Sequence, residues 1–353
     1  MRININDQMM QSTKKGVKSM IKKAELSFLN ILFCALVILI HVLSEPITHL
    51  EKESLAYAVV FFPWRLSAFV VQGFVFLAGV KMALGFAKPI KYIEYVKSRF
   101  FKVVIPYIIW AFVFYICFVV RGHFEFSFSD LAGYILRGDL AAHFYFVITI
   151  VQFYFLRPVW KIMTERIKFP IAVLMTVIIM VMSELLLPKL LESYTDRVFT
   201  TYLIFWVFGC YVGANYECFK KASEKNVKKI IAVFFTVFIL EALLSYISFT
   251  LKPISYINTV HTVYCVCAVL FAVAFSLRFG ERLMKNRLLR KIDASSYHIY
   301  LAHPLCIVLI NKIMRETGIN SLGVSLVLRA FFVYSASIAG CLVYTKLIRK
   351  KKL

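Results

Sequence analysis

Ten long apolar runs constrain this chain more than any other feature. A helix that crosses a lipid bilayer needs about 20 mostly apolar residues, and the runs are close to that length. Of the 353 residues, 61% are hydrophobic and 17% are charged, whereas a soluble domain has about 45–50% apolar and about 25% charged residues. The sequence therefore predicts an all-α, polytopic membrane protein with about ten transmembrane helices in contact with the lipid bilayer. The predicted spans lie near residues 26–44, 56–84, 103–120, 142–160, 170–188, 199–214, 230–250, 257–277, 294–311 and 322–345.

The basic residues gather in alternate segments between these runs. The formal net charge is +23, and most of the 42 Lys and Arg residues fall on one side when the N-terminus is placed inside. Cytoplasmic segments of membrane proteins are rich in Lys and Arg, so both termini are predicted to be cytoplasmic. No nucleic-acid partner is expected, because the charge does not lie on a folded soluble module with a basic face.

Charge and hydropathy divide the chain into three parts. Residues 1–24 form a basic cytoplasmic segment, residues 25–347 a single transmembrane domain, and residues 348–353 a basic cytoplasmic tail. The first run is too long for the apolar core of a signal peptide, which predicts a retained span in a multi-pass protein of the cell membrane. Nearly all eight cysteines lie in apolar runs, so no disulfide framework is expected. Cys265 and Cys267 lack a second pair of ligands, and no metal site is expected.

Polar side chains inside the predicted spans are the candidates for function, since they are costly at membrane depth. His41 lies in the outer half of the first span and Asn30 eleven residues before it. Eleven steps of about 100° return a helix to within about 20° of the same face, about 16 Å further along. This stripe could join a cytoplasmic donor to an outward-facing acceptor. Alternatively, His41 bonds a neighbouring helix and Asn30 holds two helices together.

Other ionisable groups lie within the spans. His303 precedes Pro304, which frees a backbone carbonyl and creates an irregular polar spot; a structural histidine is the alternative. Glu241 lies mid-span and could pair with Arg65 or Arg329, or handle protons.

Two further pairs lie near predicted membrane surfaces. Arg99 and Lys102 share a face at the inner end of the third span, where they could hold phosphates or serve as ordinary flanking charge. His143 and His261 lie at predicted outer ends of spans, where an interfacial histidine is common.

Five segments, in order along nearly the whole chain, give it a resemblance to a known family. They are Val37–His41, Phe74–Gly79, Tyr95–Tyr107, His143–Phe146 and Ser295–Pro304. With them the chain resembles the acyltransferase-3 family of membrane-bound, acyl-CoA-dependent O-acyltransferases. Within that family Phe205–Gly213 is similar to the polysaccharide intercellular adhesin type, whose members are described as exporters of poly-N-acetylglucosamine and have also been proposed to be O-succinyltransferases. The family usually has Arg at the positions of Asn30 and Lys102, and Ser at that of Ala78.

The resemblance implies transfer of an acetyl or succinyl group from cytoplasmic acyl-CoA to a hydroxyl of a cell-surface exopolysaccharide of the kind found in biofilms and the cell envelope. In that role His41 would act as general base or relay the acyl group, and Arg99 and Lys102 would hold coenzyme A phosphates. His303 is a second catalytic candidate. The remaining candidate binding residues are Asn30, Arg65, Glu241 and Arg329.

Two other functions remain open at this point. One is an exporter, resembling a flippase, of an exopolysaccharide such as poly-N-acetylglucosamine. The other is a structural partner of a glycan synthase, which leaves His41 and His303 without a role. A glycan synthase is a candidate partner in any of these cases.

Overall fold

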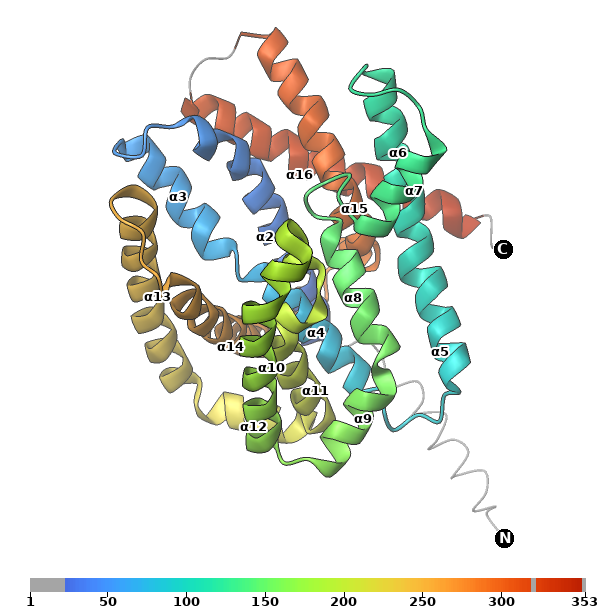
Figure 1. The fold of residues 1–353 in the computed structure, drawn as a ribbon, viewed down its shortest axis with the longest axis vertical. Helices are drawn as coiled ribbons and strands as arrows, with labels where there is room; N and C mark the ends of the chain where they lie inside the picture. The colour runs from blue at the N-terminus through green and yellow to red at the C-terminus, as the bar shows by residue number, and fades with distance from the viewer. Residues whose placement is uncertain (1–22, 319–321, 351–353) are drawn as a thin grey trace.

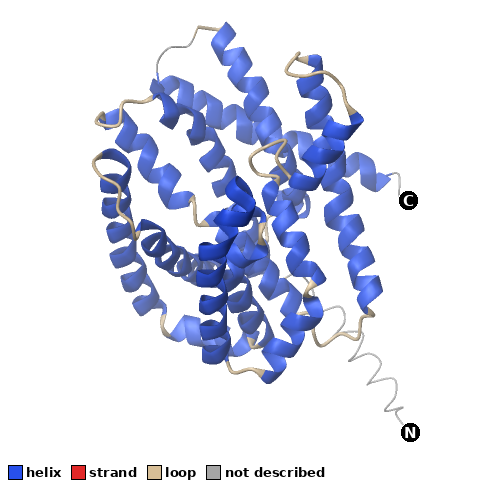
Figure 2. Cartoon of the chain, viewed as in Figure 1, coloured by secondary structure: helices blue, strands red, loops and turns tan. Residues whose placement is uncertain are grey.

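The protein is a bundle of helices (Figure 1), seen in a computed structural model that describes residues 23–318 and 322–350. Within these ranges all regular elements are helical (Figure 2). The predicted segments 1–24 and 348–353 fall mainly outside the described residues. The elements that form the body of the bundle are α2 (Ala24–His49), α3 (Leu55–Ser67), α4 (Val70–Ala83), α5 (Tyr92–Arg99), the π-helical turn η1 (Phe100–Val104), α6 (Ile105–Val120), α8 (Tyr145–Phe155), α9 (Arg157–Arg166), α10 (Phe169–Leu191), α11 (Leu203–Ala214), α13 (Val227–Thr250), α14 (Ile257–Leu283), α15 (Arg287–Glu316) and α16 (Leu322–Lys350).

The predicted all-helical membrane architecture is confirmed, and each predicted run coincides with a helix or a broken helix. Among the described residues, eight helices are long and apolar enough to cross a membrane. The pair α8 and α9, bent by 59° at its break, makes up to nine. The remaining predicted run, 199–214, corresponds to a shorter apolar helix, Phe199–Ala214. The exact number of spans and the cytoplasmic placement of the termini stay predictions.

The second span is broken between α3 and α4. Ala68 and Phe69 interrupt the helix, and the hydroxyl of Tyr264 donates a hydrogen bond to the carbonyl of Leu66 at 2.6 Å. Irregular backbone at membrane depth is tolerated where protein partners satisfy it or where it lines a cavity. The hydrogen bond from Tyr264 meets the first condition. Ala68, which lines a cavity described below, meets the second.

A short amphipathic helix connects α6 to α8. This helix, α7 (Phe128–Arg137), is capped at its start by Ser127, whose hydroxyl accepts a hydrogen bond from the backbone amide of Asp130, and at its end by Gly138, which has a φ of +68°. Positive φ is readily adopted only by glycine, so Gly138 turns the chain back into the bundle. Residues 138–144 then form the loop that delivers His143 to the interior.

The buried helix α11 packs closely against α4 through glycines. A Cβ atom added at Gly209 would lie 2.3 Å from the carbonyl oxygen of Phe76, and one at Gly213 would lie 2.4 Å from that of Val80. Small residues spaced four apart let membrane helices approach to backbone contact. Most of α11 is buried, which explains how so short an apolar helix is accommodated: protein surrounds most of its surface.

We expect Gly209→Ala to lower the thermal stability of the purified protein in detergent. The added methyl group would meet backbone, which cannot move away as a flexible side chain can. Gly340→Ala is the matched control, since nothing lies within 4 Å of its Cβ position. Alanine is better than glycine in a helix by about 1 kcal/mol, so the control should be as stable as the wild type or more so. Equal loss of stability in both variants would contradict the close α4–α11 packing.

Candidate functional site

Two cavities lie next to each other in the bundle, and helix α2 contributes to both. The first, of about 290 Å³, contains Asn30 of α2 in its wall and is here called the basic cavity. The second, of about 270 Å³, contains His41 of α2 and is called the histidine cavity. Asn30 and His41, predicted to lie along one face of the first span, therefore line two different cavities. Phe74, Phe146 and Tyr300 line both cavities.

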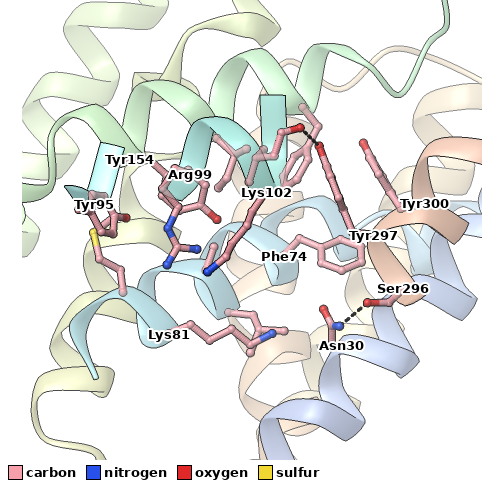
Figure 3. A pocket seen from close by; sticks show the side chains of 16 residues that line it. Asn30, Phe74, Lys81, Tyr95, Arg99, Lys102, Tyr154, Ser296, Tyr297 and Tyr300 are labelled. Carbon is pink, nitrogen blue, oxygen red and sulfur yellow. Dashed lines mark hydrogen bonds between the residues drawn. The ribbon is translucent and has the colours of Figure 1, made fainter. Parts of the chain in front are cut away.

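The basic cavity carries three cationic side chains from two segments, Lys81 of α4 and Arg99 and Lys102 of the third span (Figure 3). No Asp or Glu is among its described lining residues. A concave site with cations and no carboxylate in its wall favours anions, and phosphate in particular. Lys81 is not among the candidate residues predicted from the sequence. Ala78, one turn before Lys81, belongs to the Phe74–Gly79 segment that resembles the family, and this was the only indication in the sequence that Lys81 lies near a site.

Arg99 is held by aromatic rings. Its guanidinium carbon lies 5.0 Å from the ring centre of Tyr95 and 5.2 Å from that of Tyr154. Cations are attracted to aromatic faces at such distances. The Nε atom of Arg99 is buried and has no hydrogen-bond partner among the described residues. The side chain is thus oriented by the rings and retains hydrogen-bonding capacity for a ligand.

Lys102 enters the cavity from a π-helical turn. The third span runs from α5 through η1 to α6, and Lys102 lies in the middle of η1. The hydroxyl of Tyr297 donates a 2.8 Å hydrogen bond to the carbonyl of Val103 in this turn (Figure 3). Single π-turns in α-helices occur often at functional sites. Here the turn joins the third span to α15 beside the cavity.

Asn30 bonds to a neighbouring helix while facing the same cavity. Its side-chain amide donates to Oδ1 of Asp293 at 3.0 Å and to Oγ of Ser296 at 2.6 Å (Figure 3). The alternative that Asn30 holds two helices together therefore has direct geometric support. Asn30 nevertheless contributes to the cavity wall, so both descriptions apply to it.

The histidine cavity adjoins a cluster of three imidazole rings. The ring centres of His41 and His303 lie 5.1 Å apart, those of His143 and His303 5.3 Å, and those of His41 and His143 6.1 Å. His41 and His143 line the cavity, while His303 is fully buried against both. In the described part of the chain, no group of three or more His, Cys, Asp or Glu side chains has the arrangement of a metal site.

Backbone carbonyls orient two of these rings. His303 Nδ1 lies 2.7 Å from the carbonyl oxygen of Tyr300, and His143 Nε2 lies 3.1 Å from that of Leu301. A carbonyl only accepts, so each of these nitrogens carries the proton. The other ring nitrogens, His303 Nε2 and His143 Nδ1, are buried without a partner among the described residues. In a neutral ring such a nitrogen is a proton acceptor, so the cluster offers basic nitrogens in an enclosed space.

The sequence predicts no more than an interfacial position for His143, as it does for His261. The side chain of His143 is nevertheless only 3% exposed and packs within the cluster. Its position depends on the loop 138–144, whose path cannot be inferred from hydropathy. The similarity of His143–Phe146 to the family pattern was the only signal in the sequence.

Glu241 pairs with Arg65, and not with Arg329. The Nε atom of Arg65 lies 3.0 Å from Oε1 of Glu241, which is fully buried. The same oxygen lies 2.7 Å from Nδ1 of His261 and accepts a hydrogen bond from Ser245 at 2.8 Å. The cluster joins α3, α13 and α14. Of this cluster, only His261 lines the histidine cavity. Glu241 and Arg65 contact the ring of His261 or its partners and do not line the cavity themselves.

Arg329 lies apart from both cavities. Its Nη1 is 2.8 Å from Oε2 of Glu45, and Asn311 donates to the same oxygen at 2.7 Å. This group joins α16, α2 and α15, and none of its members is among the cavity-lining residues. The geometry explains Arg329 as the partner of a carboxylate between helices.

A family model described as an acyltransferase domain, of the acyltransferase-3 type, matches residues 23–346. The chain belongs to the acyltransferase-3 family. Curated relatives include proteins from Staphylococcus aureus strains MSSA476, MW2 and MRSA252, each named as a probable poly-beta-1,6-N-acetyl-D-glucosamine export protein. Each is 23% identical over 344 residues, which cover 88% of this chain and 94% of the relative. No solved structure was found to match the chain.

In this family member, we expect Glu241→Gln to destabilise the bundle. Removing the carboxylate leaves Arg65 largely buried and without a counter-charge, and breaking a buried pair costs about 3–5 kcal/mol. A melting curve in detergent should shift down by several degrees. Glu217→Gln, which removes an exposed partner of Lys23, should leave the curve almost unchanged. An unchanged melting curve for Glu241→Gln would show that the cluster does not stabilise the fold.

Proposed function

We propose that this protein is an acyl-CoA-dependent O-acyltransferase of the cell membrane that transfers a small acyl group to a hydroxyl of a cell-surface polysaccharide. Two adjoining cavities of different chemistry along one helix carry the proposal: one is cationic, the other contains histidines. A donor with phosphates fits the first, and a hydroxyl that must lose a proton fits the second. Membership in an acyltransferase family supports the reaction type.

The donor would bind with its phosphates at the basic cavity. Arg99 and Lys102 supply charge and hydrogen-bond donors to those oxygens, and Tyr95 and Tyr154 keep Arg99 in place. Small-molecule sites usually measure about 300–1,000 Å³, and the basic cavity, at about 290 Å³, lies at the lower end of that range, so we place only part of coenzyme A in it. It would hold the diphosphate and the pantetheine arm, with the nucleotide outside.

The acceptor hydroxyl would bind beside His41 in the histidine cavity. His41 takes the hydroxyl proton while the hydroxyl oxygen attacks the thioester carbonyl. A carbon–oxygen bond forms and the carbon–sulfur bond breaks. The coenzyme A sulfur leaves with the electron pair and receives the proton from His41. His143 and His303 surround His41, and their oriented rings would stabilise the protonated imidazole.

Export of a polysaccharide is the second candidate, because the S. aureus relatives carry that description in their names. The two cavities argue against a conduit for polymer. Each measures under 300 Å³, and aromatic side chains line the boundary between them. A small acyl group needs far less room to pass than a chain of sugar rings does.

The donor site predicts a specific loss of binding. Arg99→Gln combined with Lys102→Gln should weaken binding of acetyl-CoA and of free coenzyme A by about tenfold or more, since a hydrogen bond to a charged group contributes ~1.5–3 kcal/mol. High salt should weaken wild-type binding as well. Titration calorimetry on purified protein measures both effects. Lys88→Gln combined with Lys91→Gln removes the same charge outside the cavity and should bind normally. Equal affinity in the two double variants would show that Arg99 and Lys102 do not bind the donor and only flank the membrane span.

The acceptor site predicts a loss of chemistry without loss of folding. His41→Ala and His41→Gln should both reduce glycan acylation about 10²–10⁴-fold, the usual contribution of a general base. Glutamine keeps hydrogen bonding but cannot carry the proton. Mass analysis of the cell-surface glycan gives the acylation, and immunoblotting of membranes gives the protein level.

His49→Ala, on the exposed end of the same helix, is the control and should acylate normally. Full acylation by His41→Gln would make His41 structural. Unacylated glycan in wild-type cells, with secretion that still depends on His41, would favour the exporter.

A further inference from the structure

Three aromatic rings separate the basic cavity from the histidine cavity. Phe74 of α4, Phe146 of α8 and Tyr300 of α15 are the residues that line both cavities in the described part of the chain. Each ring contacts the other two: the ring centres of Phe74 and Phe146 are 6.0 Å apart, those of Phe74 and Tyr300 6.0 Å, and those of Phe146 and Tyr300 5.7 Å. We call this layer the aromatic partition.

Two of the three rings are held firmly by their surroundings. The hydroxyl of Tyr300 donates a 2.5 Å hydrogen bond to the carbonyl of His143, and its side chain is buried. Phe74 packs edge-on against Phe33, which is fully buried. Moving either ring would break a hydrogen bond or disturb the core.

Phe146 is held less firmly than the other two. Phe74 and Phe146 are both partly buried, but within the described residues Phe146 has ring contacts only with Phe74 and Tyr300, whereas Phe74 also contacts Phe33. Unlike Tyr300, Phe146 has no hydrogen bond to break, and unlike Phe74 it has no ring contact outside the partition. Rotation of Phe146 would therefore join the two cavities with the loss of the fewest of these contacts.

The partition also has a definite chemistry. Its phenyl groups donate no hydrogen bonds, and the only hydroxyl proton is already given to the carbonyl of His143. A carboxylate crossing this layer would lose water and gain no donor, which is strongly unfavourable. A short uncharged acyl group loses little hydration free energy in the same layer, because its atoms are nearly all apolar.

We infer that the aromatic partition selects the acyl group, with Phe146 as the side chain that moves, and that it passes acetyl in preference to succinyl or to longer chains. The inference rests on the proposed function, since it supposes that the thioester end enters from the basic cavity and reacts beside His41. Selection acts after the donor has bound, because Arg99 and Lys102 contact the part of the donor that all acyl-CoA molecules share. It therefore changes the relative rates of transfer of different acyl groups and leaves the relative affinities for their donors unchanged.

Membrane vesicles from the native cell, which contain both the protein and its glycan, provide the test. They are given radiolabelled acetyl-CoA, succinyl-CoA or hexanoyl-CoA, and label in the polysaccharide fraction is measured with wild-type protein and with Phe146→Ala. We expect the wild type to prefer acetyl-CoA by about tenfold or more over succinyl-CoA, whose carboxylate would be desolvated, and over hexanoyl-CoA, whose longer chain needs more room between the packed rings. Phe146→Ala should raise hexanoyl transfer relative to acetyl transfer by about tenfold, because it removes most of the ring. Phe146→Trp should lower it.

Two controls separate selection from a general disturbance. Phe155→Ala removes an exposed ring from the end of the same helix and should leave the donor preference as in the wild type. Calorimetry with purified protein should give Phe146→Ala the same ratio of affinities for acetyl-CoA and hexanoyl-CoA as the wild type has. A change confined to binding would contradict a role in passage.

The outcomes distinguish this inference from the proposed function. If wild-type vesicles transfer no acyl group from any donor, the proposed function fails and the inference fails with it. If the wild type transfers acetyl but prefers succinyl-CoA, or if Phe146→Ala keeps the wild-type preference, the partition does not select and the proposed function stands.

Discussion

The need to partner every polar group at membrane depth governs where the chemistry of this protein can lie. Hydrocarbon offers neither counter-charge nor hydrogen bond. Glu241 is consequently surrounded by Arg65, His261 and Ser245, and Arg329 meets Glu45. Against this background the exceptions are informative. Of the buried nitrogens without a partner among the described residues, those of Arg99, His143 and His303 lie in or beside the two cavities, where a ligand can supply a partner, whereas those of Trp206 and Arg329 lie away from them.

Helix α2 gives the two cavities their relation to each other. It presents Asn30 to the basic cavity and His41 to the histidine cavity, and the aromatic partition lies between the two cavities. A donor bound in the basic cavity and an acceptor bound in the histidine cavity would meet only across this partition. The break between α3 and α4 adds to the arrangement, because the irregular backbone at Ala68 opens space beside His41.

Much of the fold follows from the sequence, and less of the site does. Hydropathy located the apolar runs because a span must be long and apolar, whatever it packs against. The pairing of Glu241 was left between Arg65 and Arg329, since distance across a bundle is invisible in one dimension. His143 was undervalued because a loop delivers it, and the roles of Phe74 and Phe146 escaped notice because apolar rings in spans look alike. Only contacts among α4, α8 and α15 set those two rings apart.

The hydrogen bond from Tyr300 to His143 has a mechanical consequence. It ties one ring of the partition to the end of the loop 138–144, which lies on the histidine side. A glycan that shifts this loop as it binds would pull on Tyr300 and so loosen the packing around Phe146. Docking of the acceptor and opening of the passage would then be one event. In the proposed reaction, such coupling would keep the thioester away from water until a sugar hydroxyl is in place, and so would prevent hydrolysis of the donor.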